Sequence, residues 1–118
     1  MKEVTERLFK TSELILALAD SAELRVRRGD FLSALGRDDE AEAELRRALE
    51  IDPAAIEASS RLIALLITQG RQPELTEELQ RRVDAGIAEP RQAAALADLY
   101  LRDGRPDDAV AVLIRPAF

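Results

Sequence analysis

Consecutive carboxylates are the side chains of this sequence that could do chemistry. Asp38, Asp39 and Glu40 follow one another, as do Asp107 and Asp108. Grouped carboxylates can coordinate a divalent metal ion or divide the work of general acid–base catalysis. Both groups, however, stand where the pattern predicts the start of a helix, and there a carboxylate interacts favourably with the unpaired amides of the first turn. We therefore expect them to cap helices, with no metal site and no catalytic site.

The other charged residues follow helical spacing. Acidic and basic residues recur three and four positions apart, as in Glu40, Glu44 and Arg47, and such pairs form on solvent-exposed helix faces. The absence of cysteine and histidine excludes thiolate nucleophiles, imidazole bases and the common zinc sites. Glycines occur singly, so the sequence has no phosphate-binding loop. We expect a protein that is not an enzyme and that uses no cofactor.

The composition is typical of an all-helical chain. The 118 residues include 20 alanines and 18 leucines, and only 3% are aromatic. A net charge of −6 argues against nucleic-acid binding, which needs a basic face. No apolar run exceeds six residues, the length of Leu14–Ala19 and Leu62–Ile67, which is far shorter than the ~20 residues of a membrane span. We expect no signal peptide and no membrane insertion, with the cytoplasm as the default location.

Glycine recurs before arginine at a spacing of 34 residues, at Gly36, Gly70 and Gly104. Acidic residues or proline follow each glycine, and apolar residues spaced four apart come next. A glycine can end a helix in the left-handed conformation, whereas acidic residues and prolines favour the first turn of the following helix. The repeat therefore predicts helix–turn–helix units.

About fourteen residues with apolar side chains three and four positions apart precede each of these glycines, which is typical of a one-faced helix. Gly29 and Ala97 are small where we expect the paired helix to approach closely. Leu32, Leu66 and Tyr100 are large one turn later.

This pattern resembles the tetratricopeptide repeat. Unit 22–55 matches the family best, and unit 90–118 matches until it stops before its closing turn. Unit 56–89 is degenerate, because Ile63, Leu75 and Arg82 stand where the family has small residues. The matching positions of the first unit are Gly29, Leu32, Gly36, Ala41, Leu45, Ala48 and Pro53.

The resemblance implies an all-α fold, a right-handed α-solenoid of about three such repeats over residues 22–118, after an extra N-terminal capping helix in residues 1–21. It also implies a concave groove, lined by the first helix of each repeat, that binds a peptide or helix of a partner protein. Apolar groove residues would supply affinity and charged ones would set orientation. The corresponding positions are Val26, Arg27, Asp30, Ser60, Ala64, Ile67, Arg91, Asp98, Leu101 and Arg102.

One subclass of the family holds the C-terminal carboxylate of heat-shock chaperones with lysines and asparagines of this groove. At the corresponding places the sequence has Val26, Asp30, Ser60, Ala64 and Ala95, and Arg91 alone is compatible with that mechanism. We do not expect this chain to capture chaperone tails in that way.

The ends of the stack carry two further expectations. Residues 4–18 form an amphipathic helix that caps the first unit, and Asp20 with Glu23 predicts a capping box for the next helix. The last helix leaves an apolar edge, which a second copy or a continuation of the chain would cover. The alternative function is therefore a self-associating architectural module, or a supporting part of a larger protein. The edge comprises Val110, Leu113, Ile114 and Phe118.

Overall fold

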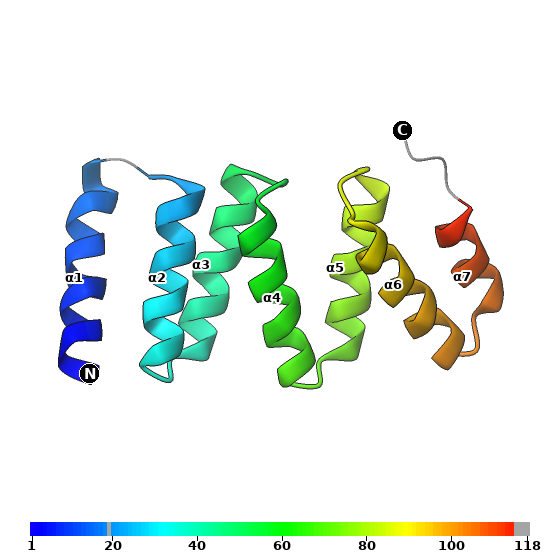
Figure 1. The fold of residues 1–118 in the computed structure, drawn as a ribbon, viewed down its shortest axis with the longest axis horizontal. Coiled ribbons are helices and arrows are strands. Elements are labelled where there is room, and N and C mark those ends of the chain that lie inside the picture. Colours follow the sequence, from blue (N-terminus) through cyan, green and yellow to red (C-terminus); the bar gives the residue numbers. More distant parts are fainter. Residues whose placement is uncertain (19, 115–118) are drawn as a thin grey trace. The chain divides into compact units, whose positions relative to one another are not determined.

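The computed structural model describes residues 1–18 and 20–114, and every regular element within these ranges is a helix (Figure 1). The absence of strands there confirms the all-α prediction. The helices are α1 (Lys2–Leu18), α2 (Ala22–Ala34), α3 (Asp38–Ile51), α4 (Ile56–Thr68), α5 (Gln72–Asp84), α6 (Pro90–Arg102) and α7 (Pro106–Leu113).

The chain forms two compact units, Met1–Leu65 and Leu66–Phe118, and the division falls inside α4. In the first unit α1 packs on α2 and α2 on α3, and in the second unit α5 packs on α6 and α6 on α7. In each unit these helices pack on the next one in sequence, as in a helical-repeat solenoid. The predicted boundary at residue 22 and the three repeat limits stay predictions.

The predicted turn glycines end their helices in the left-handed region. Gly36, Gly70 and Gly104 have φ angles of 78°, 66° and 69°. In each turn the arginine that follows donates its backbone N–H to a carbonyl five residues back, over 2.8 Å from Arg37 to Leu32 and over 2.9 Å from Arg71 to Leu66. This is the Schellman arrangement, and it pairs carbonyl groups that the end of a helix would otherwise leave unsatisfied.

The helix starts agree with the capping interpretation at the acidic groups but not at Asp20. Asp38, Asp39 and Glu40 occupy the first turn of α3. Ser21 is the N-cap of α2, where its Oγ accepts a hydrogen bond from the Leu24 N–H over 3.1 Å. The predicted capping box is therefore wrong. The Asp20 carboxylate instead binds the side chains of Arg25 and Arg47 and does not cap the helix.

Small residues allow α2 and α3 to approach closely. A Cβ added to Gly29 would lie 3.4 Å from Leu45 Cδ2 and 3.5 Å from the carbonyl oxygen of Ala41, both on α3. Leu32 and Leu45 are buried beside this contact in the first unit. Burial of such side chains is worth ~1.5–3 kcal/mol each and drives the pairing of the hairpin. The expected close approach at Gly29 is confirmed.

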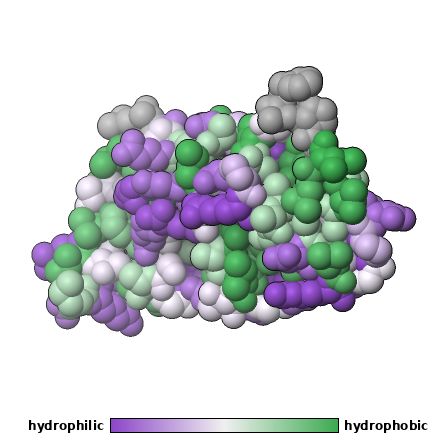
Figure 2. Space-filling model, turned by 45° about the vertical axis from the view of Figure 1, so that its right-hand side comes forward, coloured by the Kyte–Doolittle hydropathy of each residue, from purple (hydrophilic) through white to green (hydrophobic). Residues whose placement is uncertain are grey.

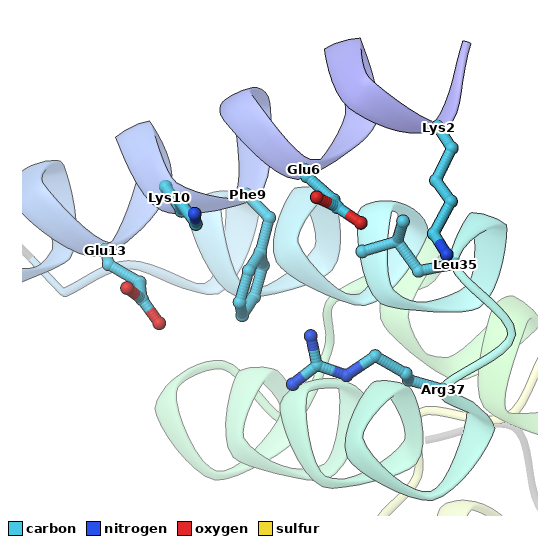
Figure 3. Close-up of a pocket in the computed structure, with 7 residues that line it drawn as sticks. All are labelled: Lys2, Glu6, Phe9, Lys10, Glu13, Leu35 and Arg37. Atoms are coloured by element: carbon cyan, nitrogen blue, oxygen red, sulfur yellow. The ribbon is translucent and has the colours of Figure 1, made fainter.

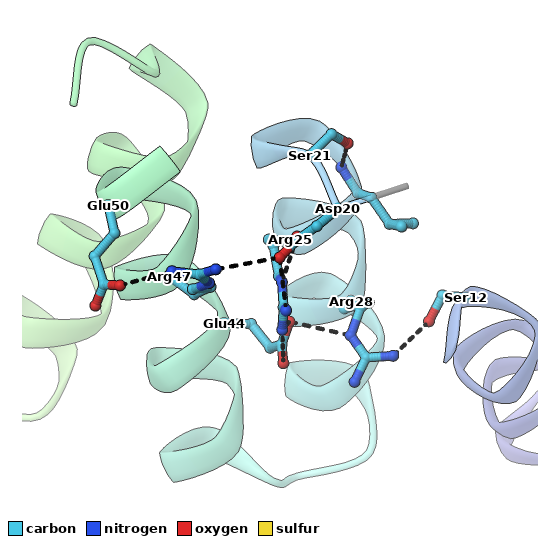
Figure 4. A network of polar contacts seen from close by, with 9 residues as sticks. Ser12, Asp20, Ser21, Arg25, Arg28, Glu44, Arg47 and Glu50 are labelled. Atoms are coloured by element: carbon cyan, nitrogen blue, oxygen red, sulfur yellow. Dashed lines mark hydrogen bonds and ion pairs between the residues drawn. The ribbon is translucent and has the colours of Figure 1, made fainter. Parts of the chain in front are cut away.

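A chain of polar contacts fastens α1 to the first hairpin (Figure 4). The buried guanidinium of Arg28 donates from Nη1 to Ser12 Oγ of α1 over 3.1 Å and from Nε to Glu44 Oε2 of α3 over 3.0 Å. Arg25 Nη1 also donates to Glu44, and Arg25 Nε donates to Asp20 Oδ1 over 2.9 Å. The hydrogen bond from Arg25 lowers the pKa of Asp20 below its usual value. The Glu44 carboxylate of α3 thus accepts hydrogen bonds from Arg25 and Arg28 of α2. Because Arg28 also binds Ser12 of α1, these contacts join the three helices.

Candidate partner-binding surface

In the first unit, the predicted charged groove residues already bind each other. Arg27 Nη1 lies 2.8 Å from Asp30 Oδ2, and Arg27 Nη2 lies 2.8 Å from Glu57 Oε2 of α4. Arg61 of α4 closes the ring, with its Nε 2.6 Å from Asp30 Oδ1 and its Nη1 3.5 Å from Glu57. The hydrogen bond that Arg27 donates to Glu57 raises the pKa of Arg27 above its usual value. These charges therefore join α2 to α4 and are largely satisfied within the protein.

The three uncharged groove residues predicted for the first unit differ in exposure. Val26 is only 2% exposed and belongs to the core, so it cannot contact a partner as predicted. Ser60 is half-buried, and Ala64 is exposed. The family resemblance placed Val26 in the groove, but packing against its neighbours buries it.

In the second unit, an apolar cavity of about 270 Å³ lies between the end of α4, the start of α5 and one face of α6. The buried side chains of Leu66 and Leu75 form part of its wall, and Leu99 is half-buried beside them. Ile67 is 60% exposed at the cavity. An exposed aliphatic side chain beside an apolar hollow is the kind of surface that takes up an apolar side chain of a partner.

Two opposite charges on α6 border this apolar cavity. Asp98 and Arg102 are exposed, four residues apart, and both line it. An aspartate followed by an arginine at this spacing commonly forms an ion pair on a helix. Here neither side chain has an ion pair or hydrogen bond with another residue in the described part of the chain. Both groups are therefore available to a partner.

The remaining predicted residues of α6 lie outside the cavity wall. Leu101 is 57% exposed but does not line the cavity. Arg91, at the start of the helix, is exposed and has its Nε 3.4 Å from Glu89 Oε2. Of the ten predicted groove residues, the structure brings together three at this cavity: Ile67, Asp98 and Arg102.

A second, more polar cavity of about 400 Å³ adjoins the first one, and the sequence did not indicate it. The two cavities share Gln72, Leu99 and Arg102 as lining residues. Glu77 of α5 and Asp103, which follows α6, also line the polar cavity. The two cavities lie beside the α4–α5 and α6–α7 turns, which are at the same end of the second unit (Figure 1). These residues come from separate helices, and no local sequence signal links them.

An aromatic ring and its neighbours form the far wall of the polar cavity. Tyr100 is 6% exposed, and its hydroxyl donates a hydrogen bond to Gln80 Oε1. The guanidinium of Arg105 lies 4.6 Å from the centre of the tyrosine ring, and its Nε is 2.8 Å from Asp108 Oδ2. Burial raises the pKa of Tyr100 above its usual value. The wall is therefore held by contacts inside the unit.

Arg82 shows how the degenerate repeat accommodates a large residue at a normally small position. Its side chain is 3% exposed, and its Nε donates to Gln92 Oε1 of α6 over 3.1 Å. The same Gln92 oxygen accepts the Glu89 backbone N–H over 3.0 Å at the start of α6. Hydrogen bonds to a buried charge are stronger than neutral ones, and they tie α5 to α6.

A third cavity, of about 360 Å³, lies beside α1 in the first unit (Figure 3). The ring of Phe9 points into it, with the Arg28 guanidinium 4.6 Å and the Arg37 guanidinium 5.4 Å from the ring centre. A cation over an aromatic face is stabilising, so these contacts add to the attachment of α1. The other lining residues carry both signs of charge and favour no one class of ligand: Lys2, Glu6, Lys10, Glu13 and Leu35.

The predicted apolar edge of α7 is exposed in the described residues. Val110, Leu113 and Ile114 are 54%, 61% and 74% exposed, and Phe118 lies outside the described residues. Figure 2 turns the α6–α7 end toward the viewer and shows hydrophobic residues at its surface.

The described residues offer neither a metal site nor a membrane span. Residues 1–18 and 20–114 hold no group of three or more carboxylates that could bind a metal ion. None of the helices in these ranges has the length and apolar character needed to cross a membrane.

Comparison with known proteins gives one family match. Residues 22–65 match the family model described as Tetratricopeptide repeat. The matched segment contains α2, α3 and most of α4, and it includes the unit that most resembled the family in sequence. No curated protein matches the chain.

Proposed function

We propose that this chain, of which residues 22–65 match the tetratricopeptide repeat family, is a non-enzymatic scaffold that binds a peptide or helix of a partner protein. Repeats of this family typically bind protein partners and are generally not enzymes. In this proposal the surface of the second unit makes the main contact.

The observation that carries the proposal is the unpaired Asp98 and Arg102 beside the apolar cavity of α6. Ile67 and the cavity walls would bury an apolar side chain of the partner, and the two charges would set its orientation. The charges of the first unit contribute less, because Arg27 and Asp30 are already bound to Glu57 and Arg61. Ser60, Ala64, Arg91 and Leu101 remain proposed members of the binding surface.

Reversal of both charges tests this proposal. The variant Asp98→Arg plus Arg102→Asp should weaken partner binding by about tenfold or more, since each reversed charge then faces a like charge on the partner. The partner is first isolated by affinity purification with the full chain, and its binding is then measured by calorimetry. Circular dichroism should be unchanged, because both residues are exposed and unpaired.

A matched control uses the same spacing on α1. Glu3 and Arg7 are also exposed, four apart and without an ion pair in the described residues. Glu3→Arg plus Arg7→Glu should leave the affinity unchanged. Undiminished binding by the α6 variant, or an equal loss in both variants, would contradict the proposed surface.

Self-association is the second candidate function. It is favoured by the exposure of Val110, Leu113 and Ile114 on α7, which a second copy of the chain could cover. In this alternative the protein is an architectural module, and its oligomeric state depends on concentration.

A further inference from the structure

We propose that the two adjoining cavities of the second unit recognise a basic peptide segment in which an aliphatic residue stands close to a lysine or arginine. The aliphatic side chain enters the apolar cavity, and the basic side chain enters the polar cavity. This inference rests on the proposed function and specifies the chemistry of the partner.

The apolar cavity selects the aliphatic residue. Its wall contains Leu66 and Leu75, both nearly fully buried, and the exposed side chain of Ile67 stands beside it. These groups offer no hydrogen-bond partner to a polar side chain, whose desolvation would then be uncompensated. An aliphatic side chain is therefore favoured against these walls, because it gains from leaving water.

The charges around both cavities select the basic residue. Asp98 borders the apolar cavity, and Glu77 and Asp103 line the polar one. None of these carboxylates has a side-chain ion pair with another residue in the ranges that the structure describes. Arg102 is unpaired as well, whereas Arg105 is neutralised by Asp108. The unpaired charged side chains that line the two cavities are therefore three carboxylates and one guanidinium, and this negative balance favours a cationic ligand.

The position of Arg102 explains why one segment can reach both cavities. Arg102, Leu99 and Gln72 line both of them, so no other helix separates the two openings. Side chains of an extended peptide alternate between its faces, and those on one face recur every ~7 Å. A short extended segment can thus place two neighbouring side chains of one face in adjoining cavities. Gln72 and Arg102 can bind the carbonyl groups of its backbone, because both carry N–H donors.

The test is a selection of random peptides by display on the full chain. The expected result is enrichment of peptides with leucine, isoleucine or methionine within a few residues of lysine or arginine. An enriched peptide without tyrosine or tryptophan is then synthesised and titrated. The sequence has one tyrosine and no tryptophan, so the change in intrinsic emission reports Tyr100, at the wall of the polar cavity.

Two variants separate the two cavities. Ile67→Asp should abolish detectable binding, and the fold should persist because Ile67 is largely exposed. The triple variant Glu77→Gln, Asp98→Asn, Asp103→Asn should lower the affinity for the basic peptide by about tenfold at low salt. The loss of affinity should be smaller at high salt. The control Glu3→Gln, Glu13→Gln, Glu23→Gln removes the same charge from the first unit and should change the affinity less than twofold.

The outcomes distinguish this inference from the proposed function. Enrichment of acidic or uncharged peptides, or equal losses in the triple variant and its control, would overturn the inference and leave the scaffold proposal standing. If no peptide is enriched and reversal of Asp98 and Arg102 does not affect the isolated partner, both are wrong. Binding without a change in Tyr100 emission would place the peptide elsewhere and would also overturn the inference.

Discussion

Tyr100 is a buried residue with a titratable hydroxyl, so the effect of burial on its ionisation can be measured. Its hydroxyl is held by Gln80 inside the second unit, and burial raises its pKa. Loss of the proton would place a charge in a poorly solvated position, which the folded state opposes. In the unfolded chain the phenol titrates near its usual pKa of ~10.

We expect the absorbance of tyrosinate to appear at higher pH in the native protein than in urea. The sign of the linked effect follows from the raised pKa: the contribution of Tyr100 to stability is complete below about pH 10 and is lost as the pH rises through the folded-state value. Tyr100→Phe should remove this alkaline loss and cost ~0.5–1.5 kcal/mol at neutral pH through the missing hydrogen bond. A native midpoint at or below the midpoint in urea would refute the prediction.

At the scale of the elements, glycine has two different roles in this fold. Gly36 ends α2 with a φ of 78°, and nothing lies within 4 Å of the position that its Cβ would take. Gly29 lies inside α2, where an added Cβ would meet Leu45 and Ala41 at ordinary contact distances. The first position needs a backbone conformation, and the second only needs limited volume.

Alanine should therefore have opposite effects at these two positions. Gly36→Ala should lower the free energy of unfolding by ~1–2 kcal/mol, because the left-handed conformation is costly for a residue with a Cβ. Gly29→Ala should leave it unchanged or raise it by up to ~1 kcal/mol, because alanine favours the helix. Urea denaturation of the two variants measures the difference, and an equal loss in both would show that the contact at Gly29 is tighter than ordinary packing.

At the scale of the whole molecule, the exposed apolar residues of α7 allow the self-association alternative to be tested. If a second copy covers this edge, the mass measured by light scattering after size exclusion should rise with concentration. Leu113→Lys should then reduce that rise, because it places a charge in the contact while the residue itself is 61% exposed. A monomer at every concentration would remove the self-association alternative.

The helical hairpins could be predicted from sequence because their signals are local. Gly36, Gly70 and Gly104 each end a helix through their own backbone conformation. Acidic residues or prolines begin the next helix a few residues later. Asp20 was assigned to a cap by the same local logic, but its carboxylate binds Arg25 and the more distant Arg47, while Ser21 caps the helix. Local rules fail where a side chain from another helix competes for the same group.

The candidate site could be predicted only in part, because its properties depend on packing and pairing between helices. The family pattern pointed to Ile67, Asp98 and Arg102, and these do lie at one cavity. It could not show that Arg27 and Asp30 are engaged by α4, or that Val26 is buried. The polar cavity was missed altogether, because Glu77 and Asp103 are separated in sequence and meet only in the folded unit.

The buried guanidinium of Arg82 limits how freely these repeats could be shuffled. One of its hydrogen-bond acceptors is Gln92 of α6, in the predicted following repeat, and another is the carbonyl oxygen of Ile87 between α5 and α6. A recombinant chain that joined the middle repeat to a successor without that glutamine would lose this charged hydrogen bond, at a cost of about 1.5–3 kcal/mol. The middle and last repeats would therefore be inherited or transplanted as a matched pair.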